Sequence, residues 1–267
     1  VYESSSIALN SGTTINIASA SPASTVLSST VSDDAYAVWV CDAGCSGVAL
    51  ESDLAACVSG GTCVAGASAQ GGTGDSTALT FTHNIDSALD DGAVTAYAQA
   101  SDAAGNPLIV TVSGTLDTSA PAYQSSSITI NSGATINSAN QGSVDVQLAS
   151  SVSGDTYKVW ACDDSLCTAT STESGLTTCT SSGHCASGGA LAGTGGTVTA
   201  TVNVQALADG TDAVSVHVVV EDGALNSAVV NKVASKDTHI EYYGSAVTLN
   251  GGSGYINDAS KAASSVV

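Results

Sequence analysis

The feature that most constrains this chain is a repeat of roughly 120 residues. The segment Tyr2–Gly12 returns with few changes as Tyr123–Gly133, and more loosely from Tyr242 onward. An Ile-Asn pair follows each copy. A repeat of this length is large enough to be a small domain with its own core. The sequence therefore predicts two complete domains, at 1–120 (unit one) and 121–240 (unit two), and a partial third repeat at 241–267.

Three further landmarks keep the same register in both units. They are a Tyr-x-Val-Trp-x-Cys segment, an Asp-x-x-x-Asn segment, and an Asp-Thr pair that stands just before each new copy begins. In unit one they lie at Tyr36–Cys41, Asp102–Asn106 and Asp117-Thr118; in unit two they lie at Tyr157–Cys162, Asp222–Asn226 and Asp237-Thr238.

Within each unit the local pattern is that of β-strands. Leu108–Val112, Val198–Val204 and Val214–Val220 are rich in β-branched residues and are bounded by Gly, Asn, Asp, Ser or Pro. No segment shows a capped apolar stripe with helical spacing. Short strands at regular intervals predict an all-β fold, a sandwich of about seven strands per unit. Asp102–Asn106 reads as the turn of a late hairpin.

Large aromatic residues are scarce, at 4% of the chain, so the cores must consist of Val, Ile, Leu and Ala. Trp39 and Trp160 occupy equivalent places on a strand in the middle of each unit. We expect each of them to be buried and to fill a core of otherwise small side chains.

These motifs carry a resemblance to a known family. The opening Ile128-x-Ile-Asn-Ser-Gly-Ala-Thr-Ile-Asn137, the closing Asp-Ala-Ala-Gly-Asn and the Asp-Thr-Ser-Ala-Pro junction are similar to prokaryotic extracellular immunoglobulin-like repeats. Such repeats occur in secreted surface proteins, adhesins and fibres. The resemblance implies two tandem Ig-like Greek-key β-sandwiches and an extracellular or cell-surface location. It specifies architecture more than activity.

Each unit contains four cysteines at nearly the same spacing, which admits either a zinc site or two disulfides. Structural zinc favours Cys-x2-Cys pairs, and neither unit contains one. His184 lies beside Cys185, but its counterpart in unit one is Thr62, so no histidine ligand repeats. The extracellular location that the resemblance implies favours disulfides. The cysteines are Cys41, Cys45, Cys57, Cys63, Cys162, Cys167, Cys179 and Cys185.

Three pairings are possible within each unit. The expected one is local, with Cys41–Cys45 and Cys57–Cys63 in unit one, and Cys162–Cys167 and Cys179–Cys185 in unit two. A nested arrangement, Cys41 with Cys63 around Cys45 with Cys57, is a close rival. In either case the bridges would hold together a long loop that follows the tryptophan strand.

The charge balance excludes several partners. The chain has 24 acidic residues and four lysines, with a net charge of −20. Binding to nucleic acids or to anionic lipids needs a basic surface, so neither is expected. No apolar stretch is long enough to span a bilayer, so membrane insertion is not expected either.

Nothing in the sequence predicts catalysis. His83, His184, His217 and His239 stand outside any nucleophile or zinc-protease motif, and the paired aspartates lie in turn-like sequence. No cofactor is expected. Calcium is the one metal to consider, because Asp117 and Asp237 recur at the unit junctions, but no Asp-x-Asp-x-Asp loop accompanies them. Their first interpretation is therefore a role in turns.

The partial third repeat suggests a function. On their own, its apolar residues would lie on unpaired strand edges, which proteins rarely tolerate. If the chain ends here, this tail would add a strand to another copy, and head-to-tail strand donation would build a homopolymeric extracellular filament. Unit one, however, has its own first strand at Ile7–Asn10, so the sequence shows no vacant place. The candidate tail residues are Val247, Leu249, Ile256, Val266 and Val267.

Two other functions compete with the filament. The chain is alternatively a segment of a longer adhesin or stalk made of tandem Ig-like repeats. A carbohydrate-binding module is a weaker third reading, since it needs an exposed aromatic platform and the chain has only two tryptophans.

Overall fold

The computed structural model describes residues 6–10, 14–28, 30–68, 78–163 and 165–238. Within these ranges the chain is all-β apart from short helices, as the sequence predicts. No helix among the described residues combines the length and the apolar character that a membrane crossing requires. The segment 241–267, which includes all five candidate tail residues, lies outside the described residues.

Unit one is formed by two sheets. The first has the strand order β1 (Ile7–Leu9), β3 (Ala23–Leu27), β7 (Leu79–His83), β6 (Ala67–Ser68). The second has the order β2 (Thr14–Asn16), β9 (Pro107–Asp117), β8 (Gly92–Ser101), β4 (Ala35–Asp42), β5 (Cys63–Ala65). Neighbouring strands are antiparallel except β2 and β9, which run parallel.

Unit two repeats this plan. One sheet has the order β10 (Ile128–Ile130), β11 (Val144–Leu148), β14 (Val198–Val202). The other has the order β13 (Cys185–Ala192), β12 (Thr156–Cys162), β15 (Gly210–Glu221), β16 (Ser227–Lys236). Short 3-10 turns at Ser125–Ser127 and Asn131–Gly133 flank β10. In both units the first strand, β1 or β10, pairs with the next long strand of its own unit.

Each unit has a separate apolar core between its two sheets. Alternate residues of a strand point to opposite faces, so β3 buries Ala23, Thr25 and Leu27 in the core. In unit two, Val146 and Val218 do the same from facing sheets. These cores consist mostly of Ile, Val, Leu and Ala, as the composition requires.

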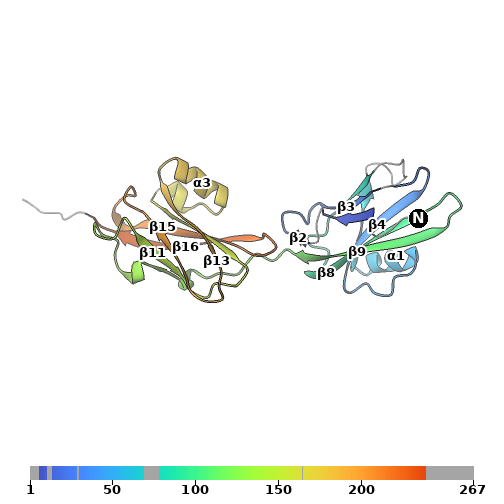
Figure 1. Ribbon diagram of the computed structural model, residues 1–267, viewed down its shortest axis with the longest axis horizontal. Coiled ribbons are helices and arrows are strands. Elements are labelled where there is room, and N and C mark those ends of the chain that lie inside the picture. The colour runs from blue at the N-terminus through green and yellow to red at the C-terminus, as the bar shows by residue number, and fades with distance from the viewer. Residues whose placement is uncertain (1–5, 11–13, 29, 69–77, 164, 239–267) are drawn as a thin grey trace, which may run out of the picture.

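Helices appear where the sequence predicts only a loop. In unit one α1 (Glu51–Ser59) lies between β4 and β5; in unit two α2 (Ser165–Thr168) and α3 (Glu173–Ser181) lie between β12 and β13. We call these two segments, 43–62 and 163–184, the cysteine insertions. Figure 1 shows α1 and α3 outside the sheets, on different sides of the long axis.

The two tryptophans lie under these helices. Trp39 and Trp160 are each 7% exposed, and each belongs to a small apolar cluster apart from the core between the sheets. The alternation along β4 explains this, because Val38 and Val40 face the main core and Trp39 faces the other side. Leu54 of α1 covers Trp39, and Leu176 of α3 covers Trp160.

Candidate functional site

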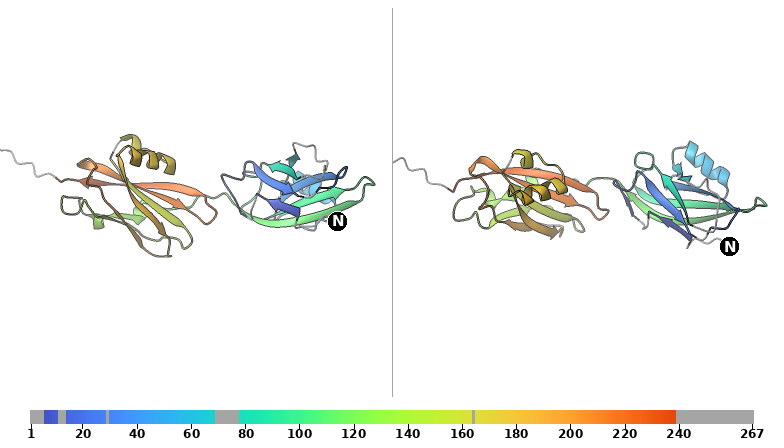
Figure 2. Two further views of the ribbon diagram at one scale, coloured as in Figure 1. Left: turned by 45° about the horizontal axis from the view of Figure 1, so that its top comes forward. Right: turned by 90° about the horizontal axis from the view of Figure 1, so that it is seen from above.

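The two units meet end to end, and the turn between β15 and β16 forms the contact from the side of unit two (Figures 1 and 2). Asp222 organises this turn. Its Oδ1 accepts hydrogen bonds from the backbone N–H groups of Ala224 and Asn226, both at 2.9 Å. Its backbone N–H donates to the Asn226 carbonyl at 3.0 Å, and its Oδ2 accepts from Asn226 Nδ2 at 3.1 Å. An Asp that closes on its own backbone in this way makes a rigid turn.

The side chain of Asn226 joins the two units. Its Oδ1 accepts a hydrogen bond from the Ile17 N–H at 2.9 Å. Its Nδ2 donates to the Asp117 carbonyl oxygen at 2.8 Å, and to Asp117 Oδ1 at 3.3 Å. Asn226 is 0% exposed, so both ends of its carboxamide are buried and satisfied.

The two backbone groups that bind the Asn226 side chain lie at the ends of β2 and β9, the one parallel strand pair among the described residues of unit one. β2 ends at Asn16, which lies opposite Asp117 at the end of β9. The Ile17 N–H and the Asp117 carbonyl therefore lie side by side. A local turn fixes this end, since Asn16 Oδ1 accepts from the Ser19 N–H and the Asn16 N–H donates to Ser19 Oγ, both at 3.0 Å. The repeated Ile-Asn pair thus builds one half of the junction.

The start of the linker is held by Asp91. Its Oδ1 accepts from the Thr118 N–H and Oγ1 at 2.8 Å, and its Oδ2 accepts from Ser119 Oγ at 2.6 Å. These bonds, that from Ser119 foremost, hold the pKa of Asp91 below its usual value. In unit two, Asp209 Oδ2 accepts a hydrogen bond from Thr238 Oγ1 in the same way, at 2.6 Å. In both units the threonine of the Asp-Thr pair is thus bound to an aspartate of its own unit, and in unit one this is the point at which the linker begins.

The two junction aspartates make different hydrogen bonds: the Asp117 carboxylate accepts, whereas Asp237 donates through its backbone. Asp117 Oδ1 accepts from Asn226 and, at 3.3 Å, from the Ser119 N–H. The exposed Asp237 donates its backbone N–H to the Ile136 carbonyl at 2.8 Å. Within the described residues, the groups of three or more potential metal ligands are cysteine clusters, not carboxylates.

All eight cysteines form disulfides, and the pairing is nested. Cys41 bonds to Cys63 and Cys45 to Cys57; in unit two Cys162 bonds to Cys185 and Cys167 to Cys179. The local pairs Cys41–Cys45, Cys57–Cys63, Cys162–Cys167 and Cys179–Cys185 are therefore wrong.

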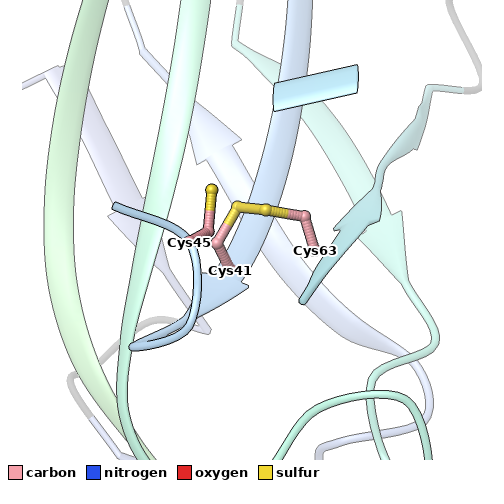
Figure 3. A group of neighbouring side chains, drawn as sticks. All are labelled: Cys41, Cys45 and Cys63. Atoms are coloured by element: carbon pink, nitrogen blue, oxygen red, sulfur yellow. A yellow bond between two sulfur atoms is a disulfide. The ribbon is translucent and has the colours of Figure 1, made fainter. Parts of the chain in front are cut away.

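The strand register explains the nested pairing. Cys41 on β4 lies directly opposite Cys63 on β5, with 4.0 Å between their Cα atoms. Figure 3 shows the Cys41–Cys63 bond between these two strands, with Cys45 beside it. Cys45 is thereby left to reach Cys57 on α1, and this bond ties the helix to the end of β4.

The histidines of the described residues lie in separate settings. His83 is buried beside Thr25, with Nε2 and Oγ1 3.1 Å apart, and burial lowers its pKa to about 4. Burial also lowers the pKa of His217 on β15. His184 is exposed and lies 3.2 Å from an Asp163 carboxylate oxygen. His239 lies outside the described residues.

The two tryptophans do not form the exposed aromatic platform that a carbohydrate-binding module needs. Both are covered by the cysteine insertions, so they cannot stack on a sugar from solvent. The sequence predicts the turn that contains Asn226, but it does not predict that the Asn226 side chain joins the two units. Its one signal in the sequence is that the Asp-x-x-x-Asn segment recurs in both units.

No protein-family model and no curated protein sequence matches the chain. Solved structures do match. The matching structures include two bacterial adhesins and a large adhesion protein. One is a Ca²⁺-stabilised adhesin with which an Antarctic bacterium binds ice, at 20% identity and a TM-score of 0.45, covering 91% of this chain and 50% of that one.

Two other neighbours are of the same kind. A 1.5-MDa bacterial ice-binding adhesin matches at 18% identity and a TM-score of 0.40, covering 87% of this chain and 65% of that one. A tetra-tandem repeat from the extending region of a large adhesion protein matches at 16% identity and a TM-score of 0.29, covering 84% and 48%. In each case the chain spans less than two thirds of the solved structure.

Proposed function

We propose that the chain is a segment of a longer cell-surface adhesin or stalk, in which tandem Ig-like units act as a spacer. The observation that carries this proposal is the buried Asn226 carboxamide, which fastens the second unit to the end of the first. The repeat itself supplies the groups that join its two copies end to end. Units joined in this way extend the chain in one direction.

The linker between the units supports a stiff spacer. Its start is held by the hydrogen bonds from Thr118 and Ser119 to Asp91. Its end is held by Tyr123, whose hydroxyl donates to the Ala149 carbonyl at 2.9 Å. The Tyr123 ring packs edge-on against Tyr157, and burial raises the pKa of Tyr123 to about 12. Only 120–122 lie between these anchors, and Pro121 restricts their backbone further.

The covalent and surface chemistry agrees with an extracellular place. Four disulfides form and persist in oxidising surroundings outside the cytosol. A net charge of −20 keeps neighbouring copies apart in solution, which suits a protein that is displayed at high density.

Strand donation is the competing function. It requires the tail residues to pair with another copy in a place that the acceptor leaves open. In both units the described first strands, β1 and β10, occupy that place in their own sheets. The filament therefore has less support than the spacer, and the same experiment decides between the two.

Negative-stain electron microscopy of 1–267 beside a 1–240 truncation, under oxidising conditions, is that experiment. A spacer segment gives dispersed two-lobed rods from both chains. Filaments from 1–267 that disappear in the truncation would overturn the spacer and establish strand donation. Antibody labelling of intact producing cells tests the location in parallel, and labelling only after lysis would contradict a surface protein.

A further inference from the structure

Unit one carries a second copy of the turn that makes the junction. In Asp102–Asn106 the Asp102 Oδ1 accepts from the backbone N–H groups of Ala104 at 3.0 Å and Asn106 at 2.8 Å. The Asp102 N–H donates to the Asn106 carbonyl at 3.2 Å, and Asn106 Nδ2 donates to Asp102 Oδ2 at 2.8 Å. Each of these bonds has its counterpart in Asp222–Asn226. The two turns are therefore built alike.

The two copies differ in what covers them. Asn226 is fully buried because the end of unit one lies on it, whereas Asn106 is exposed along with the rest of its turn. Asn106 Oδ1, the atom equivalent to the one that accepts from Ile17, has no hydrogen-bond partner among the described residues. Unit one thus presents to solvent the same carboxamide that unit two uses to hold its neighbour.

The position of the exposed turn fits the same purpose. The turn between β8 and β9 lies at the end of unit one that points away from the junction (Figures 1 and 2). The β15–β16 turn occupies the corresponding end of unit two and reaches back to unit one. The units therefore point the same way along the axis.

We propose that the Asp102–Asn106 turn is a docking seat for the carboxyl-terminal end of a preceding unit of this same repeat. The inference rests on the proposed function and names the partner that binds this exposed turn. The occupant must offer two groups side by side: the carbonyl at the end of its last strand, which accepts from Asn106 Nδ2, and a backbone N–H just after its second strand, which donates to Asn106 Oδ1. Ile17 and Asp117 show how one unit of this repeat provides both.

The test is a lengthened chain in which residues 1–122 are joined directly to residues 2–267. The join keeps the native linker, because Ala122 is then followed by Tyr2 instead of Tyr123. In this chain the second copy of the Asp102–Asn106 turn follows the carboxyl-terminal end of the first copy of unit one. In the native chain the same end of unit one binds Asn226. The first copy keeps its turn free and serves as the internal control.

The measurement is hydrogen exchange of asparagine side-chain carboxamides, followed by NMR after selective ¹⁵N labelling of asparagine. In the native chain Asn226 exchanges slowly and Asn106 exchanges at the rate of an exposed amide. In the lengthened chain we expect one additional slow carboxamide, retarded about tenfold or more. Asn106→Ala in the second copy removes this signal, whereas Asn106→Ala in the first copy removes none.

The outcomes separate docking from function. If the lengthened chain shows no additional slow carboxamide while Asn226 stays slow, the docking seat is overturned and the surface-spacer function stands on its own test. If the additional carboxamide appears but the protein is absent from the surface of intact cells, the docking seat stands and the proposed function falls. The decisive arm uses unsubstituted units, so it does not depend on any variant that fails to fold.

Discussion

The carboxamide of Asn226 is surrounded by groups that an isosteric acid cannot satisfy. Its Nδ2 donates to the Asp117 carbonyl and to carboxylate oxygens of Asp117 and Asp222. An amide nitrogen here carries the partial positive charge that three oxygens require. A carboxylate in its place would put a third negative charge between two others.

We therefore expect Asn226→Asp to loosen the junction more than Asn226→Ala at pH 7. Alanine removes hydrogen bonds worth about 1–3 kcal/mol in all, whereas aspartate adds charge repulsion to that loss. Residual dipolar couplings provide the measurement: one alignment tensor fits both native units, and two tensors are needed once the units move independently. Asn106→Asp is the matched control, with no change expected in the chain 1–267. A single tensor for Asn226→Asp would refute this account of the junction.

Burial of His83 makes the stability of unit one depend on pH. In the folded protein its pKa is about 4, below the value of about 6.5 in an unfolded chain. The unfolded state therefore binds the proton more tightly. The stability of unit one is therefore highest above about pH 6.5 and falls as the pH drops toward 4, by about 3 kcal/mol in total.

Unit two provides the control for this histidine. It has Val202 at the place of His83 and Val146 at the place of Thr25. The double substitution His83→Val with Thr25→Val should flatten the pH dependence of unit one between pH 7 and 4. Urea unfolding at several pH values measures the free energy of unfolding as a function of pH. An unchanged pH dependence in the double variant would count against His83 as the titrating group.

At the scale of elements, α1 and α3 are each held by one disulfide and one buried leucine. In unit one these are Cys45–Cys57 and Leu54, and together they cover Trp39. Replacing Cys45 and Cys57 with alanine should release α1, expose Trp39 and shift its fluorescence to longer wavelength. The cost is about 2–3 kcal/mol for a loop of this length.

The sheets of unit one should survive this change, because Cys41–Cys63 and the main core remain. Replacing Cys167 and Cys179 instead should expose Trp160 and leave Trp39 buried. Near-UV and far-UV circular dichroism would detect a wider loss of structure, which would show that the helix is part of the folding core.

The same elements show what the sequence could and could not predict. Strands and hairpin turns follow from β-branched runs and from Asp-x-x-x-Asn, because these signals are local. The helices do not, since α1 and α3 bury one apolar residue each, Leu54 and Leu176, and so lack a stripe that periodicity could reveal. The nested disulfides depend on strand register, which cysteine spacing does not encode.

The junction is hidden from sequence reasoning for a different reason. Ile17 lies 209 residues before Asn226, and Asp117 lies 109 residues before it. The motif thus predicts the turn but not the group that it binds, because that group belongs to another unit. Only the recurrence of the motif indicates that the turn serves the repeat as a whole.

For the whole molecule, the hydrogen bonds at the junction predict independence from calcium. Asn226 Nδ2 donates to a carboxylate oxygen of both Asp117 and Asp222, so a hydrogen-bond donor already lies between the two negative charges. Small-angle X-ray scattering of the chain should give the same maximum dimension with excess EDTA as with millimolar calcium. A dimension that changes on chelation would mean that a metal ion, and not the amide, sets the arrangement of the units.

The nested bridges also set how far such a chain can stretch. Cys41–Cys63 closes a separation of 22 residues, and Cys162–Cys185 closes one of 23. If a unit is unfolded by a force on its two ends, the disulfide carries the tension, and the residues that it encloses are not extended. Each unit then lengthens by about 75 Å less than its full chain would allow. Under tension, oxidised units would therefore lengthen less than reduced ones.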